Sequence, residues 1–127
     1  MTTLYLTPGD DFVYTATVTD DDGAAYSLVG TTLWFTAKRR ISDPDADAIA
    51  ALYWVSGGAS DGISVTAPSS GVAEIAIDTT GTLDFVQAAH RWDLQIEGTD
   101  GKRRTVDSGV LVIRPGVTTR VTTTPDP

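Results

Sequence analysis

The chain has 127 residues, 41% of them hydrophobic, and a mean hydropathy of -0.03, which is the size and composition of one globular domain. It has no cysteine, which excludes disulfides, thiolate metal sites and a cysteine nucleophile. Its net charge of -8 disfavours nucleic acid as a partner. Residues 1–10 have no basic or apolar leader, and no run of about 20 apolar residues follows, so a soluble chain without a targeting signal is expected.

The acidic residues are almost all of one type, since 15 of the 17 are Asp. Asp is common in turns and rare in helices and strands. Thr is also abundant, with 20 copies, and its branched side chain favours the half-buried surface of a strand. Together these biases predict many short strands joined by turns.

The first half of the chain contains two segments that alternate between apolar and polar side chains, residues 11–19 and 31–38. This alternation predicts strands with one face in the core, and it places Trp34 on the solvent side. The Asp22-Gly23 pair after the first segment is typical of a tight hairpin. The residues expected to face inward are Phe12, Tyr14, Ala16, Val18, Leu33, Phe35 and Ala37.

The middle of the chain is less regular. Residues 39–47 contain a proline and several charged side chains, which predicts an exposed loop. Residues 49–55 are interpreted as a strand, although their first part also suits a helical turn. Short strands are expected from residue 63 and over residues 72–77, and residues 79–89 suit one or two helical turns.

Residues 91–97 alternate most clearly, with Trp92, Leu94 and Ile96 on the inward side. The Asp-Gly pair at residues 100–101 predicts a second hairpin, followed by strands over 102–106 and 109–113. Seven or eight short strands at roughly 10-residue spacing predict an all-β antiparallel sandwich over residues 1–116, with one possible short helix near residues 80–89. Residues 117–127 form a Thr/Pro-rich arm, which is either flexible or an extended strand added to a neighbour.

Two arrangements that could support catalysis are weak. A G-x-S-x-G pattern surrounds Ser60, and Asp84 and His90 follow in the order of a hydrolase triad. That motif needs a strand, a strained elbow and a helix within a doubly wound sheet, whereas this segment is typical of a glycine-rich turn. Glu74 and Glu97 could be imagined as a glycosidase pair, but each lies among outward-facing strand residues. The chain is therefore not expected to be an enzyme.

A metal site is not expected either. Residues 43–47 carry alternating carboxylates, as at the start of a calcium-binding loop. The Gly and Glu that such a loop needs at its sixth and twelfth positions are replaced by Ala48 and Trp54. Residues 20–22 are interpreted as a solvated turn, and a single histidine excludes a histidine cage. No cofactor is expected.

The surface offers better candidates for protein binding. An outward Trp has a hydrophobic cost in water and is enriched in interfaces, although a loop or the C-terminal arm could also cover it. Two basic runs, at residues 38–40 and 102–104, could pair with acidic partners in an assembly or be solvated strand ends. The candidate interface residues are Trp34, Lys38, Arg39, Arg40, Arg103, Arg104, Val117, Thr119 and Val121.

The order of several segments supports a family resemblance. The segments are Gly9-Asp10, residues 18–23, 28–38, 92–96 with Asp100-Gly101, and 109–113. Together they resemble the immunoglobulin-like domain of tailed-phage baseplate and tail proteins, and the chain looks like the N-terminal domain of the baseplate upper protein family. The similarity spans residues 8–116.

The resemblance implies an immunoglobulin-like sandwich without catalytic residues, repeated around a symmetry axis. Such a domain attaches one virion component to another, in the tail, baseplate or neck of a particle assembled in the host cytoplasm. Its expected partners are other virion structural proteins, with no nucleic acid and no membrane. Two alternatives are a capsid decoration protein and a carbohydrate or cell-surface binding module with Trp34 and Trp54 as stacking platforms.

Overall fold

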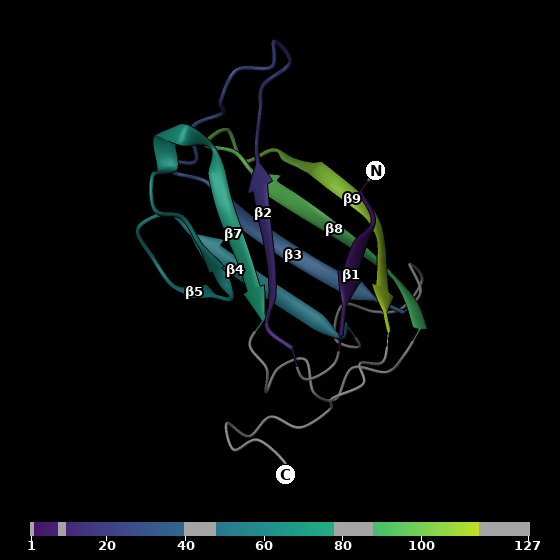
Figure 1. Cartoon of the computed structure of the whole chain (residues 1–127). Helices are drawn as coiled ribbons and strands as arrows, with labels where there is room; N and C mark the ends of the chain where they lie inside the picture. The colour runs from purple at the N-terminus through teal and green to yellow at the C-terminus, as the bar shows by residue number, and fades with distance from the viewer. Residues whose placement is uncertain (1, 8–9, 40–47, 78–87, 115–127) are drawn as a thin grey trace.

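The computed structural model describes residues 2–7, 10–39, 48–77 and 88–114, which form strands and one turn of 3-10 helix (Figure 1). The all-β class predicted from the sequence is confirmed. The elements are β1 (Leu4–Leu6), β2 (Phe12–Thr17), β3 (Thr32–Lys38), β4 (Ala50–Val55), β5 (Ser60–Asp61), β6 (Ile63–Ser64), η2 (Pro68–Ser70), β7 (Val72–Ile77), β8 (Ala88–Glu97) and β9 (Arg103–Ile113).

The strands form two sheets that face each other (Figure 1). Sheet A has the order β1-β9-β8-β3-β4-β5, and sheet B has the order β2-β7-β6. Strands β2, β7 and β6 take the places of strands B, E and D in a variable-type immunoglobulin domain, and β9, β8, β3 and β4 take those of G, F, C and C′. The predicted sandwich is confirmed, with the topology of the immunoglobulin fold.

The core lies between the sheets because alternate side chains of each strand point inward. Every residue predicted to face inward from the first two alternating segments is buried, except Tyr14, which is half-buried. The buried apolar residues are Leu4, Leu6, Phe12, Ala16, Val18, Leu28, Leu33, Phe35, Ala37, Ala50, Ile63, Ala73, Ile75, Trp92, Leu94, Ile96, Leu111 and Ile113.

Both Asp-Gly turns are present. In the first, the Asp20 carboxylate accepts hydrogen bonds from the backbone N–H groups of Asp22 and Ala24, and Gly23 takes the positive φ of 82° that such a turn needs. In the second, the Asp100 carboxylate accepts from the Lys102 N–H and joins β8 to β9. The Asp side chains therefore close these turns.

One side of the sandwich is closed by the chain itself. Strands β5 and β6 are separated only by Gly62, whose φ of 75° lets the chain leave sheet A and enter sheet B. The Gly62 carbonyl accepts a hydrogen bond from the Ala76 N–H of β7, and Gly62 also bridges Tyr53 of β4. The two sheets are thus continuous on this side.

Several details of the sequence prediction were wrong. Nine strands are described instead of seven or eight, because Leu4–Leu6 forms a strand that was not expected and because β5 is separate. That first strand pairs with β9 in parallel, so the sheets are not entirely antiparallel. Residues 103–113 are one strand with a register shift opposite Leu94 and Gln95, not two strands. Of the predicted helical turns, Ala88 and Ala89 belong to β8 and the rest lies outside the described residues.

Candidate functional site

The outer face of sheet A carries a group of apolar side chains that the core does not use. Trp34 of β3 lies directly opposite Tyr53 of β4, and Thr32 lies opposite Val55. Tyr53 and Val55 are each 37% exposed, and Trp34 is half-buried. We call Trp34, Tyr53 and Val55 the aromatic patch. The outward direction predicted for Trp34 is confirmed by the alternating burial of β3.

Arg103 of β9 lies across the aromatic patch. Its guanidinium carbon is 4.7 Å from the centroid of the Trp34 ring, within the range of a cation–π contact. The same side chain forms an ion pair with Glu97, with Nε 3.8 Å from the carboxylate oxygen Oε2. Because Arg103 remains largely exposed, the pair holds the guanidinium over the indole without removing its charge from water.

Lys38 and Arg103, one from each basic run predicted at the interface, are at opposite ends of this face. Lys38 ends β3 and lies opposite Arg91 of β8, and Arg39 follows it on the surface. Arg104 points away from Arg103, with its guanidinium 5.2 Å from the ring centroid of Tyr26. The remaining predicted interface residues, Arg40, Val117, Thr119 and Val121, lie outside the described residues.

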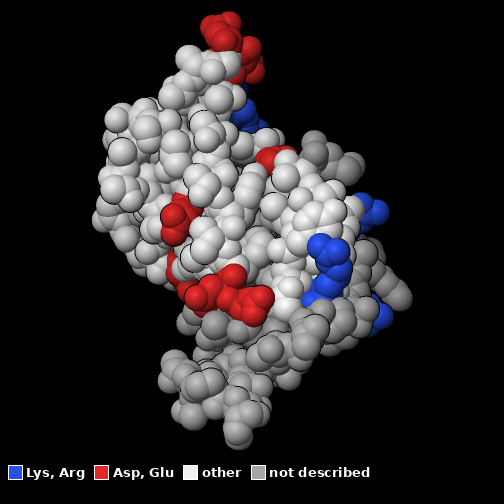
Figure 2. Space-filling model, viewed as in Figure 1, with Lys and Arg blue, Asp and Glu red and all other residues white. Residues whose placement is uncertain are grey.

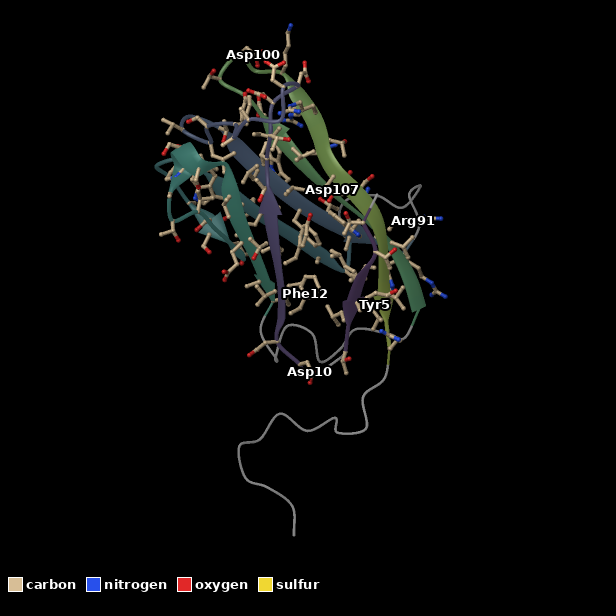
Figure 3. The ribbon with its side chains drawn as sticks, turned by 45° about the horizontal axis from the view of Figure 1, so that its top comes forward. Tyr5, Asp10, Phe12, Arg91, Asp100 and Asp107 are labelled. Carbon is tan, nitrogen blue, oxygen red and sulfur yellow. The ribbon has the colours of Figure 1, made fainter. Side chains whose placement is uncertain are left out.

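A second aromatic residue lies at the β1 edge of the same face. Tyr5, opposite Val112 of β9, is 57% exposed. The Arg114 guanidinium carbon is 4.4 Å from the centroid of the Tyr5 ring. Figure 3 shows Tyr5 on β1, at the end of the sandwich where Phe12 begins β2. Sequence reasoning missed this pair because it did not predict β1.

A hydrogen-bonded cluster around Asp107 of β9 joins the two sheets. The Asp107 Oδ2 accepts from the Tyr14 hydroxyl at 2.8 Å and from the Thr2 hydroxyl at 2.9 Å, and Asp107 lies midway along β9 (Figure 3). The Trp92 Nε1 donates to the Thr2 carbonyl at 3.1 Å, and the Thr2 N–H donates to the Ser108 carbonyl at 2.9 Å. These bonds fix the segment before β1 against β8, β9 and sheet B.

The cluster shifts the pKa values of Tyr14 and Asp107 in opposite directions. Burial, followed by the hydrogen bond and charge of Asp107, raises the pKa of Tyr14 above its ordinary range. Desolvation alone would raise the pKa of Asp107, but hydrogen bonds from Tyr14, Thr2 and the Ser108 N–H outweigh it and hold this pKa below its usual value. The arrangement therefore keeps the phenol protonated and the carboxylate charged, which is the state of a structural contact.

Asp107→Asn is expected to lower the free energy of unfolding by about 1–3 kcal/mol at neutral pH, because a charged acceptor of three hydrogen bonds is lost. A folded-state pKa below the unfolded value gives stability that is present above the ordinary Asp pKa of about 3.9 and is lost as the pH falls below it. Urea unfolding at several pH values should show the gap between variant and wild type narrowing in acid. A gap independent of pH would contradict the role of the Asp107 charge.

The candidate catalytic groups do not meet. Ser60 is exposed in β5 and His90 is buried in β8, with β4 and β3 between these strands, while Asp84 lies outside the described residues. Glu74 is on the outer face of sheet B and Glu97 on the outer face of sheet A, so the sandwich separates them. These positions give neither a triad nor a glycosidase pair.

Within the described ranges, no group of three or more His, Asp or Glu side chains could hold a metal ion, and residues 43–47 fall outside those ranges. No helix in the described part of the chain is long and apolar enough to cross a membrane. Trp54, which was considered as a sugar platform, is half-buried and packs against the core.

Comparison with known proteins adds no relative. No family model matches the chain, and no curated protein matches it either.

Proposed function

We propose that this chain is a non-enzymatic structural component of a tailed-phage virion, a small sandwich subunit that joins proteins of the tail, baseplate or neck. The observation that supports it most is the aromatic patch, which lies outside a sheet whose inner side already fills the core. Trp, Tyr and Arg are the residue types most enriched at the energetic centres of protein interfaces. The resemblance of residues 8–116 to phage tail domains is the reason for proposing a tailed-phage particle.

The surroundings of the aromatic patch also suit a protein partner. Outward residues of β3, β8 and β9 place charges of both signs around it, namely Lys38, Arg91, Asp93, Glu97 and Arg103. An apolar centre with a polar rim is the usual anatomy of a protein interface. The partners in this proposal are other virion proteins, in several symmetric copies, and the chain acts in the virion after assembly in the host cytoplasm.

Carbohydrate binding has less support. A sugar ring stacks on an open aromatic face, whereas Arg103 lies 4.7 Å from the centroid of the Trp34 ring. Trp54 is turned toward the core. A capsid decoration protein would use the same patch on a different part of the particle, so the location of the chain distinguishes the two.

The test is the presence of the chain in phage particles purified from a lysate of the infected host. Quantitative mass spectrometry should find a fixed copy number per particle, and antibody labelling in the electron microscope should place the chain on the tail, baseplate or neck. A Trp34→Ala/Tyr53→Ala chain should fold but fail to enter particles, while the control Val72→Ala, on the outer face of sheet B, should enter normally. Absence of the wild-type chain from particles would refute the proposal, and labelling of the head would replace it by decoration.

A further inference from the structure

Strand β2 is an edge strand of sheet B. It pairs with β7 on one side, and no described strand lies on its other side (Figure 1). The opposite edge of sheet B is β6, which is continuous with β5 through Gly62. The sandwich is therefore closed on the β5–β6 side and open, among the described residues, along β2.

The hydrogen bonds at the end of β2 show which of its residues direct their backbone N–H and C=O groups to the open edge. The Val18 N–H donates to the Gly71 carbonyl at 2.7 Å, so the backbone groups of Val18 point to the β7 side. Because the backbone groups of successive strand residues point to alternate sides, those of Val13, Thr15 and Thr17 point to the open edge. The Ala76 N–H donates to Gly62 on the far side of β7, which confirms this alternation.

This edge lacks the features that keep most edge strands from pairing. Natural edges are commonly protected by Lys, Pro, a bulge or a very short strand. Residues Phe12–Thr17 contain no Lys, Pro or Gly, pair with β7 without a register shift, and expose Val13 to 57%. Such a strand is suited to accept another strand.

The charges beside β2 make it unfavourable for the β2 strand of a second copy to pair with this edge. Asp10 and Asp11 precede β2, and residues 20–22, all Asp, follow it. Figure 2 shows acidic groups at both ends of this face and further acidic groups between them. Antiparallel pairing of two β2 strands would bring the acidic start of one copy beside the acidic turn of the other, which is unfavourable. The accepted strand should instead be neutral or basic.

The chain contains one such segment. Residues 117–124 read Val-Thr-Thr-Arg-Val-Thr-Thr-Thr, which is almost entirely β-branched, carries one positive charge at Arg120 and has no acidic residue. Pro115-Gly116 precedes it and Pro125 follows it. Its length is sufficient to cover the six residues of β2.

We propose that residues 117–124 of one copy add as a strand to the open edge of β2 in a neighbouring copy. Strand β9 ends beside β1 at the end of the sandwich where β2 begins (Figures 1 and 3), so the same chain could offer this segment only in the parallel direction. A neighbouring copy can offer it antiparallel, as in the rest of sheet B. This inference rests on the proposed role in an assembly of repeated copies and supplies one contact between them.

The test uses two variants of the full chain that remove different halves of the contact. Thr15→Pro removes an N–H that points to the open edge and is not used within sheet B. The variant should fold and should still offer residues 117–124 to a neighbour, but its β2 should not receive a neighbour's strand. The Val121→Pro variant should receive a strand at β2 but should not offer one. Thr15→Val and Thr119→Val, which keep every backbone N–H, are the matched controls. Near-ultraviolet circular dichroism checks the fold, and Thr17→Pro replaces Thr15→Pro if the latter is unfolded.

Native mass spectrometry and light scattering should show that the wild type and both controls self-associate as concentration rises. Each proline variant alone should be a monomer, and an equimolar mixture should form a complex of one chain of each kind and stop there. A monomeric wild type, association that persists in Val121→Pro, or a mixture that stays monomeric would overturn the strand exchange. None of these results affects the particle test, which depends on the presence of the chain in particles and on the variant of the aromatic patch.

Discussion

Trp92→Ala is expected to lower the free energy of unfolding by about 3–5 kcal/mol, a large part of the roughly 5–15 kcal/mol of a domain of this size. The Trp92 side chain is 3% exposed. Its ring stacks on Phe35, with centroids 5.5 Å apart, and makes an edge-to-face contact with Tyr14, with centroids 5.3 Å apart. Truncation would leave a cavity at the centre of the sandwich and remove the hydrogen bond to the Thr2 carbonyl. Urea unfolding followed by circular dichroism measures the loss.

Trp34→Ala is the matched control, because it makes the same truncation on the other side of sheet A. The variant loses the contact with Arg103 but opens no cavity, so the expected cost is about 1 kcal/mol. Equal losses in the two variants would contradict the assignment of Trp34 to the outer face.

Gly109→Ala is expected to displace the segment before β1 and to cost about 2–4 kcal/mol. A Cβ at Gly109 would overlap the carbonyl oxygen of Thr2, which is backbone and cannot swing aside as a side chain would. Moving Thr2 away breaks its hydrogen bonds with Ser108, Trp92 and Asp107, each worth about 1 kcal/mol. Amide hydrogen exchange should show reduced protection of Leu4–Leu6.

Gly23→Ala separates this effect from the general cost of replacing a glycine. Gly23 has a φ of 82° and nothing within 4 Å of its added Cβ, so only the backbone strain of about 1–2 kcal/mol applies. Protection of the β1 amides should be unchanged in this variant. Full protection of β1 in Gly109→Ala would show that Thr2 does not hold the strand in place.

The central strands could be predicted from the sequence because their two faces differ. In β2, β3 and residues 90–97 of β8, every second side chain is buried between the sheets, except for the half-buried Tyr14, so the apolar and polar residues alternate in the sequence itself. The turns after β2 and β8 were also predictable, since the Asp20 and Asp100 side chains that close them act within four residues.

The edges could not be predicted in the same way. Strand β1 has three residues, too few for an alternation to be recognised, and its partner residues in β9 are more than 100 positions away. Strand β9 was predicted as two strands, 102–106 and 109–113, with Asp107 and Ser108 between them. There the Asp107 side chain instead accepts hydrogen bonds from Tyr14 and Thr2 beside a register shift.

The candidate site was found in part. The outward direction of Trp34 follows from its own strand, but its neighbours Tyr53 and Arg103 come from β4 and β9. Their approach depends on the register between strands, and no local pattern specifies that register. The cluster of Tyr14 and Asp107, 93 positions apart, was missed for the same reason.

The proposed binding surface, the aromatic patch, can be tested directly by hydroxyl-radical footprinting of the chain, free and within purified particles. Trp34 and Tyr53 should be oxidised more slowly in the particle than in the free chain, while the half-buried Tyr26, which lies outside the aromatic patch, should react equally in both. Unchanged oxidation of Trp34 and Tyr53 on assembly would show that the outer face of sheet A is not the binding surface.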